Sequence, residues 1–303
     1  MVMGRWKAVR GYSLRAAELA GAVAGVVTAV LALAAGCALL GVAAAGGGGA
    51  VVGIVLAAVL VVCAFVGCER MALSAMLAGP VSEVEQPELY RLVRELSKDG
   101  RLPVPRLYVS PAEQPNAFAV GRGPRSAAIC CTEGLLAALD ETELRAVLGH
   151  ELGHVSGRDL LASTAAAGLA TVITFPALLP RLARPDAVDG ASEPGAAEKL
   201  LMLVLGPVAA VMVRLSVSRE REYQADASGA LLTGDPLALA RALRTIEAGA
   251  VAVPLAPDGR RVSAGHLMIV SPFVPVGVAR LFLAHPAAGE RIRRLEALAG
   301  YRR

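Results

Sequence analysis

The chain has 303 residues, of which 55% are hydrophobic, 18% are charged and only 4% are aromatic. Soluble domains usually carry more charge than this, so the composition argues against a purely soluble protein. The formal net charge is only +4 and its basic excess lies partly near the N-terminus, so nucleic-acid binding is not indicated.

Two long uncharged runs near the N-terminus predict a transmembrane hairpin. Residues 19–45 and 50–68 contain no charged side chain, and each run is long enough to cross a hydrocarbon core about 30 Å thick. Four glycines at 46–49 separate the runs and predict a short flexible turn. A secretory signal peptide is the alternative, because the start is basic and small residues precede the turn. The first run is longer than a signal core, however, and a second follows at once.

Basic residues lie at both ends of this hairpin but not at its turn. Four precede the first run and one follows the second: Arg5, Lys7, Arg10, Arg15 and Arg70. Because positively charged flanks stay on the cytoplasmic side of a membrane, both ends of the hairpin are expected in the cytoplasm.

After residue 68 the sequence becomes that of a folded domain. Apolar residues at helical spacing predict a helix over residues 87–98. Three short β-capable runs predict a small sheet or hairpin over residues 106–110, 116–120 and 127–131. Three further helices are expected over residues 218–232, 236–248 and 286–298.

A helix is also predicted from Asp140 to about Gly157. Asp140 and Glu143 form a capping-box pair at its start, and leucines and valines then recur at helical spacing. The sequence GHELGHV, residues 149–155, lies on this helix. Because charged residues both precede and follow the motif, the helix is not expected to span a membrane.

A second pair of apolar segments follows at residues 160–180 and 200–213, separated by a charged linker. Their lengths fall at the edge of what crosses a membrane. Two alternatives therefore stay open. The segments form a second transmembrane hairpin, which we expect, or they lie along the membrane surface.

The motif GHELGHV carries a metal-binding pattern. His150 and His154 lie four residues apart, so a helix places both imidazoles on one face, where they can bind one Zn²⁺. The Glu151 carboxylate can stand beside the metal and accept a proton from the attacking water. An ordinary helix with two polar-face histidines is the alternative. Because the motif holds two of only four histidines in the chain, we expect a catalytic site for one zinc ion per chain.

A catalytic zinc ion takes three protein ligands and keeps one position open. A third histidine six residues after His154 is excluded, because Leu160 occupies that position. The best candidate is Glu222. Asp226 lies four residues further on the same helical face and is expected to orient a ligand histidine, whereas Glu220 points away. A solvated helix with Arg–Glu pairs is the alternative for this run.

Together with the two apolar pairs, these motifs resemble the HtpX-type membrane zinc metalloproteases, gluzincins related to the Ste-type CAAX prenyl proteases. The resemblance covers nearly the whole chain in element order, and its specific parts are the HExxH sequence and the Glu-xxx-Asp run. It implies a multi-pass protein of the bacterial plasma (inner) membrane. It also implies a role in protein quality control and stress response.

Two further patches match the resemblance. Asn116, Ala117 and Phe118 resemble a strand near the active cleft, where a substrate backbone can add to an exposed edge. His285 and Arg291 resemble a C-terminal motif that the resemblance places near the active site. Either residue is a candidate for a catalytic role or for stabilising the oxyanion, although a proline after His285 also suits a helix start.

We therefore expect a mainly α-helical integral membrane protein with an N-terminal transmembrane hairpin. A cytoplasmic α+β zincin-like catalytic domain with a small β-sheet completes it. The expected segments are a basic cytoplasmic N-terminus (residues 1–15), the transmembrane hairpin (16–68), the first half of the catalytic domain with the HExxH helix (69–159), the second apolar pair with its linker 181–199 (160–217), and the second half with the third ligand (218–303).

The expected function is that of a membrane-anchored zinc endopeptidase acting on the cytoplasmic side. Its expected partners are misfolded or membrane protein substrates and the lipid bilayer, with the oligomeric state left open. Two alternatives remain. A prenyl-peptide protease would need more membrane spans than the four visible here. A non-catalytic membrane scaffold stabilised by zinc would need a fourth protein ligand.

Overall fold

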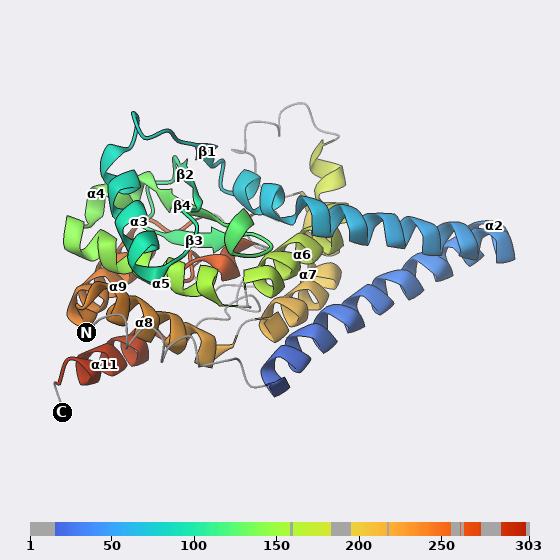
Figure 1. The fold of residues 1–303 in the computed structure, drawn as a ribbon. Coiled ribbons are helices and arrows are strands. Elements are labelled where there is room, and N and C mark those ends of the chain that lie inside the picture. The colour runs from blue at the N-terminus through green and yellow to red at the C-terminus, as the bar shows by residue number, and fades with distance from the viewer. Residues whose placement is uncertain are drawn as a thin grey trace.

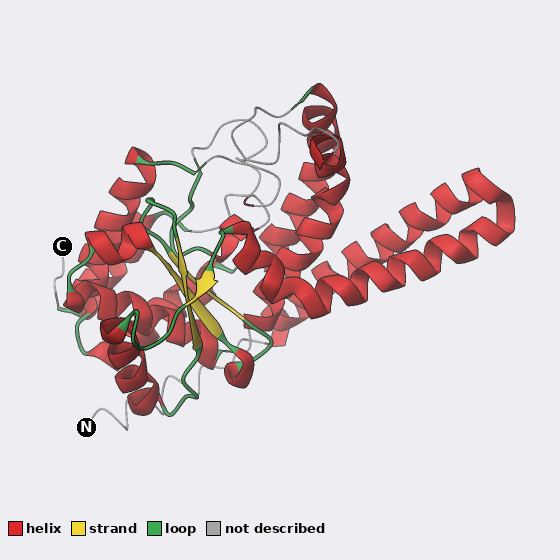
Figure 2. Cartoon of the chain, turned by 90° about the horizontal axis from the view of Figure 1, so that it is seen from above, coloured by secondary structure: helices red, strands yellow, loops and turns green. Residues whose placement is uncertain are grey.

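The computed structural model describes residues 16–157, 160–182, 195–216, 218–255, 261, 264–273 and 286–300. Within these ranges the fold is mostly helical with one small mixed sheet. A long helical hairpin projects from a domain built of helices around the sheet (Figures 1 and 2). The mainly helical character and the small sheet expected from the sequence are thus confirmed.

The hairpin is formed by α2 (Ala16–Ala75), which reverses direction at Ala45 and Gly46. Gly46 has φ +62°, a conformation that glycine adopts without steric cost. The reversal is therefore sharper than the four-glycine flexible turn expected from the sequence, because the chain is helical again at the following glycines. The two arms pack closely. A Cβ on Gly53 would lie only 2.2 Å from the Cys37 carbonyl oxygen.

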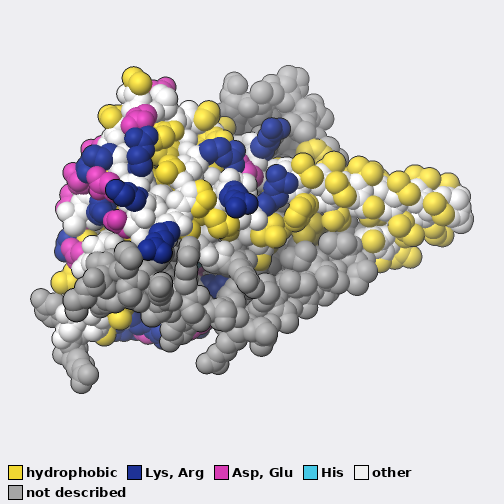
Figure 3. All heavy atoms as spheres, in the orientation of Figure 1, with side chains coloured by type: hydrophobic (Ala, Val, Ile, Leu, Met, Phe, Trp, Pro, Cys, Tyr) yellow, Lys and Arg dark blue, Asp and Glu magenta, His cyan; other side chains and the backbone are white. Residues whose placement is uncertain are grey.

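The second arm of this hairpin has the surface of a membrane segment. The stretch Gly41–Ala75, which runs from just before the reversal to the end of the second arm, is long and apolar enough to cross a membrane, and only 22% of its most apolar window is buried in the molecule. Figure 3 shows hydrophobic side chains covering the projecting arm, with charged side chains gathered on the domain. An exposed apolar surface of this extent is stable in lipid rather than in water.

The second apolar pair is helical and packs beside the hairpin. It forms α6 (Leu160–Leu182) and α7 (Ala196–Ser216). Their shared core with α2 contains Ala64, Leu169, Ala170, Ile173, Ala209, Ala210 and Val213. The stretch Leu160–Ala177 is also long and apolar enough to span a membrane, but 56% of it is buried, while Lys199–Val211 is apolar but shorter. The outward side of α7 exposes Leu200, Leu203, Val204, Val208 and Val211.

The sheet has four strands in the order β1-β2-β4-β3. These are β1 (Gly79–Pro80), β2 (Arg106–Ser110), β3 (Ala117–Val120) and β4 (Ala128–Thr132). β2 and β4 are parallel, and the other two pairings are antiparallel. The three strands predicted from the sequence are confirmed, and β1 adds a short edge. β3 forms the opposite edge, next to the HExxH helix.

One face of the sheet rests on the end of α2. The helix continues past Cys68, where the sequence suggested the span would end, and reaches Ala75. Ala72 and Leu73 in its last turns, and Met76 just after it, pack against Phe118 of β3 and against β4. The second arm of the α2 hairpin therefore runs directly into the domain and is held there by its packing on the sheet.

The other face of the sheet is covered by helices. These are α3 (Pro87–Gly100), α4 (Glu133–Ala138), α5 (Glu141–Ser156), α8 (Arg219–Thr233), α9 (Pro236–Ala252) and α11 (Ala288–Leu298). Their buried leucines, such as Leu92, Leu148 and Leu243, form one continuous core with β4. Two short 3-10 turns, η1 (Pro124–Ser126) and η3 (Gly265–Leu267), complete the described elements.

Glycines let α5 and α8 approach each other closely. A Cβ on Gly229 of α8 would lie 2.7 Å from the backbone nitrogen of His150 on α5. A Cβ on Gly153 of α5 would lie 3.2 Å from the Ala225 backbone. Because backbone atoms cannot move aside as flexible side chains can, these contacts fix the spacing of the two helices.

We expect Gly229→Ala to push these helices apart and to lower the free energy of unfolding by about 1–3 kcal/mol. Thermal unfolding of the full chain in detergent, followed by circular dichroism, measures this effect. Gly289→Ala is the matched control, because its Cβ would meet only the end of a flexible side chain at 3.9 Å. A loss of stability at Gly289 equal to that at Gly229 would contradict the spacing argument.

Candidate metal centre

Helix α5 carries the HExxH motif into the core. Its start is fixed by the predicted capping box: the Glu143 backbone nitrogen donates to Asp140 at 2.8 Å, and the Glu143 carboxylate accepts from the Asp140 backbone nitrogen. The helix ends at Ser156, as the sequence indicated. His150 and Glu151 are fully buried, and His154 is half-buried, so the helix presents its motif to an interior site.

Helix α8 brings a carboxylate to the two histidines. His150 Nε2 and His154 Nε2 lie 3.2 Å apart. The Glu222 oxygens lie 3.6 Å from His154 Nε2 and 4.0 Å from His150 Nε2. One ligand atom from each of the three residues lies within 4.8 Å of the others. The structure thus gathers the two histidines and the candidate third ligand at one point.

A buried network stands behind His150. Its Nδ1 lies 2.9 Å from the Asp226 carboxylate. Arg291 donates to the two oxygens of Asp226 at 2.6 and 2.8 Å and to the Ile269 carbonyl at 2.6 Å. A carboxylate that accepts a hydrogen bond from Nδ1–H leaves the Nε2 lone pair of His150 free to bind a metal ion beside Glu222. Asp226, predicted from the sequence to orient a ligand histidine, thus lies in contact with Nδ1 of His150.

Burial and charge set the protonation of these groups. Burial lowers the pKa of His150 from 6.5 to about 4, against the opposing effect of Asp226. Burial acts to raise the pKa of Asp226, but the charge and hydrogen bonds of Arg291 and His150 hold it below 3.8. Asp226 is therefore ionised and His150 is neutral at physiological pH, which is the form that binds a metal.

Glu151 lies next to this group without belonging to it. Burial raises the pKa of its carboxyl from 4.5 to about 7, partly offset by His154, by Arg291 and by a hydrogen bond from the Ala119 backbone. Its Oε2 atom has no hydrogen-bond partner among the described residues. A buried carboxyl with a pKa near neutrality is suited to accept and return a proton.

The donor set fits a divalent metal ion. Two neutral imidazoles and one carboxylate are the ligands of many catalytic zinc sites, which leave a fourth position open. The described residues that could hold a metal as a group are His150, His154 and Glu222, with no fourth protein ligand among them. The buried Glu151 Oε2 atom, which has no hydrogen-bond partner among the described residues, is consistent with a site that a further group completes.

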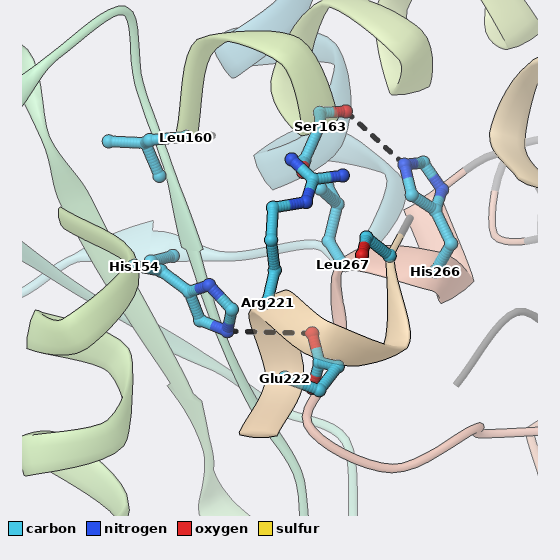
Figure 4. Close-up of a pocket in the computed structure, with 9 residues that line it drawn as sticks. His154, Leu160, Ser163, Arg221, Glu222, His266 and Leu267 are labelled. Carbon is cyan, nitrogen blue, oxygen red and sulfur yellow. Dashed lines mark hydrogen bonds and ion pairs between the residues drawn. The ribbon is translucent and has the colours of Figure 1, made fainter. Parts of the chain in front are cut away.

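A pocket opens onto this centre (Figure 4). Its walls come from β3, α5, α6, α8 and η3, and they include Ala119, His154, Ser163, Arg221, Glu222 and His266. The Nε2 atom of His266 lies 3.2 Å from the Ser163 carbonyl oxygen, which ties η3 to α6. A substrate group that enters the pocket therefore lies beside the metal-binding residues.

The residues singled out from the sequence at the start of β3 are buried: Asn116 lies just before the strand, and Ala117 and Phe118 lie in it. Asn116 donates through its side chain to the Val270 carbonyl at 2.9 Å, and the Ala117 carbonyl accepts from the Ile269 nitrogen at 2.9 Å. Phe118 packs against the end of α2. The outer edge of β3 at Ala117 is thus already paired within the chain, and Ala119 is the β3 residue that reaches the pocket.

Two residues of the pocket wall, Arg221 and His266, were not predicted from the sequence to be part of the site. Arg221, which fits an exposed Arg–Glu helix by sequence, is only 7% exposed and lines the pocket. His266 had no ligand spacing to another residue, yet it forms part of the pocket wall. Only their positions beside Glu222 and α6 reveal them. His285 lies outside the described residues, and Arg291 faces Asp226 behind the site and is absent from the pocket walls.

Two histidines on one helix, a glutamate on a second, a buried neighbouring carboxyl and a pocket beside them define a metallopeptidase. Comparison with known protein families gives the same class. Residues 83–299 match the family model of Peptidase family M48, and the chain belongs to this family.

Curated relatives extend the likeness to most of the chain. A Protease HtpX homolog of Kineococcus radiotolerans is 55% identical over 236 residues, covering 77% of this chain and 80% of that protein. The homolog of Paenarthrobacter aurescens is 49% identical over 77% of this chain and 79% of its own length. That of Pelotomaculum thermopropionicum is 41% identical, over 76% and 83% respectively. The resemblance expected from the sequence is thereby confirmed.

The chain is therefore a membrane-anchored metalloendopeptidase that acts on peptide or protein substrates. Its family implies a metal cofactor, and the structure groups His150, His154 and Glu222 as possible ligands. The alternative of a non-catalytic scaffold is not supported, since the family is one of peptidases.

Proposed function

We propose that the chain is a zinc endopeptidase in which His150, His154 and Glu222 hold one Zn²⁺. The observation that carries this proposal is the convergence of the three ligand atoms within 4.8 Å, beside a buried carboxyl and a pocket. When bound, the zinc ion supplies a Lewis acid for the scissile carbonyl and lowers the pKa of water toward about 7.

The residues around the metal have separate roles in the reaction. Glu151 accepts the proton of the attacking water and returns it to the leaving amine, which its raised pKa favours. Asp226 keeps the Nε2 lone pair of His150 directed at the site. Arg291 holds Asp226 in that position through two hydrogen bonds. Ala119 bounds the pocket on the β3 side, where a substrate backbone would lie.

The membrane arrangement forms part of the proposal. The α2 hairpin and the α6–α7 pair cross the bilayer of the bacterial plasma membrane, with the metal centre and the N-terminus in the cytoplasm. The basic residues that flank the hairpin support this orientation, and the exposed apolar side of α7 supports insertion of the second pair. The substrates proposed are misfolded or membrane proteins removed in quality control, as the HtpX resemblance implies.

Replacing the third ligand tests the zinc site. We expect Glu222→Gln to weaken zinc affinity by more than about 100-fold, because even partners behind the ligands contribute 10- to 100-fold. Zinc retained after dialysis against a competing chelator, measured by atomic absorption, gives the affinity. Glu220→Gln is the matched control, since Glu220 is exposed on the same helix. Unchanged zinc affinity in Glu222→Gln would assign the third ligand elsewhere.

A further inference from the structure

A cationic side chain lies in the pocket wall without a hydrogen-bond or ion-pair partner among the described residues. Arg221, in the first turn of α8, is only 7% exposed. Figure 4 shows it extending from α8 toward Ser163, with His154 on one side and His266 on the other. Its guanidinium makes no hydrogen bond or ion pair with any described residue. By contrast, the buried Arg291 is bound by Asp226 and a backbone carbonyl.

Burying an unpaired cation is costly. Charged side chains in protein interiors are normally paired, and an unpaired buried charge destabilises the fold. The same helix leaves Arg219, two residues earlier, exposed to solvent. The cost at Arg221 is therefore specific to its position, and it is offset if an anion from outside the chain enters the pocket.

The surroundings of Arg221 favour binding of an anion. The pocket also contains the apolar side chains of Leu160 and Leu267 and the methyl group of Ala119. In such a poorly solvated space a charge-assisted hydrogen bond is stronger than it is in water. A guanidinium offers parallel N–H groups that match the two oxygens of a carboxylate.

The same pocket is lined by His154 and Glu222. A group bound at Arg221 therefore lies next to the peptide bond that the metal centre cleaves.

We propose that Arg221 forms a subsite for a substrate carboxylate adjacent to the scissile bond. This inference rests on the proposed function. The carboxylate comes from an aspartate or glutamate side chain, or from the C-terminus of a substrate cut close to its end. Both sources present the same chemistry to the guanidinium, and matched peptides distinguish them.

The first test compares peptides on the zinc-loaded full chain in detergent. A sequence cleaved from casein is resynthesised with both ends blocked and with either Glu or Gln next to the cleaved bond. A third peptide carries Gln there and a free C-terminal carboxylate one residue after the bond. We expect kcat/KM to be about 10- to 100-fold higher for one of the two carboxylate peptides than for the blocked Gln peptide. Equal rates for all three would overturn the proposal.

The second test assigns the preference to Arg221. In Arg221→Met the preference should vanish, so that this variant cleaves the carboxylate peptide and the blocked Gln peptide at the same rate. Arg219→Met is the matched control and should keep the preference, since Arg219 is exposed. Arg221→Gln replaces Arg221→Met if the latter fails to retain zinc. A preference that survives loss of the Arg221 charge overturns the assignment.

A binding measurement separates this inference from the proposed function. Glu151→Gln is expected to bind peptides without cleaving them, so fluorescence anisotropy gives the Kd of labelled Glu and Gln peptides directly. Tighter binding of the carboxylate peptide by about 10- to 100-fold supports the subsite even if no peptide is cleaved by the wild type, a result that would refute only the proposed function. Cleavage without any discrimination refutes only the subsite.

Discussion

Glu151→Gln is expected to lower kcat/KM for casein or peptide cleavage by about 10²- to 10⁴-fold, the usual contribution of a positioned general base. Glutamine has nearly the same shape but cannot accept the proton from the attacking water. Zinc content should stay at about one ion per chain, because Glu151 lies beside the ligand group rather than in it. Full-length wild type and variant, purified in parallel and assayed with a quenched fluorescent peptide, provide the measurement.

The matched control for this variant is Glu133→Gln, which changes an exposed glutamate on α4 and should leave the rate unchanged. A Glu151→Gln protein that binds zinc and cleaves as fast as the wild type would remove Glu151 from the mechanism. A variant that loses zinc would instead show that this carboxylate helps to hold the metal.

The same substitution should change how stability depends on pH in the metal-free protein. Burial raises the pKa of the Glu151 carboxyl from 4.5 to about 7, so the folded state prefers it protonated. Its contribution to stability is present below about pH 4.5 and is lost as the pH rises through 7, where a charge must be buried. Glutamine carries no charge, so metal-free Glu151→Gln should unfold at a higher temperature than the wild type at pH 8 and at a similar temperature at pH 5.

Local signals in the sequence predicted the elements of the site well. Asp140 and Glu143 predict the capping box at the start of α5, and the leucine spacing predicts the length of the helix. Both signals are readable in the sequence because the interactions lie within one helix. The approach of Glu222 to the histidines was expected from the motif pair, although periodicity alone favoured a solvated helix. The close contact of α5 and α8 at Gly153 and Gly229 buries Glu222 instead of leaving it on a solvated helix. This contact depends on how the two helices pack.

Tertiary contacts between distant segments could not be predicted from the sequence. Ile269 pairs with the outer edge of β3 at Ala117, which no local pattern signals, so the strand expected to receive substrate is already paired there. Arg221 and Arg291 are both buried arginines, but one lies in the pocket wall and the other behind the site. The residues next to both arginines in the sequence are similarly charged. Only the fold shows that Arg221 lines the pocket and that Arg291 holds Asp226.

Arg291→Met is expected to lower the free energy of unfolding by about 3–5 kcal/mol, the usual result of removing one partner of a buried ion pair. Arg291 is 1% exposed, and its Nη1 atom also lies 3.5 Å from a Glu222 oxygen. Methionine fills similar space but leaves Asp226 as a buried carboxylate that has lost its two strongest hydrogen bonds. Thermal unfolding of the metal-free full chain measures the change, and Arg293→Met, at a position whose side chain is 70% exposed on the same helix, should alter stability by no more than about 0.5 kcal/mol.

The Arg291 substitution should also weaken zinc binding by about 10- to 100-fold, because an Asp226 that moves or takes up a proton no longer fixes the Nδ1 proton of His150. Measuring both the loss of stability and the loss of zinc affinity distinguishes a positioning role of Arg291 from a purely structural one. Asp226→Asn should keep most of the packing but weaken zinc affinity to a similar extent, since a neutral amide is a poorer acceptor for His150. If Arg291→Met destabilises the fold while Asp226→Asn leaves zinc affinity unchanged, the arginine supports the fold alone. If both variants lose affinity together, the path from α11 through Asp226 to His150 is what prepares the metal centre.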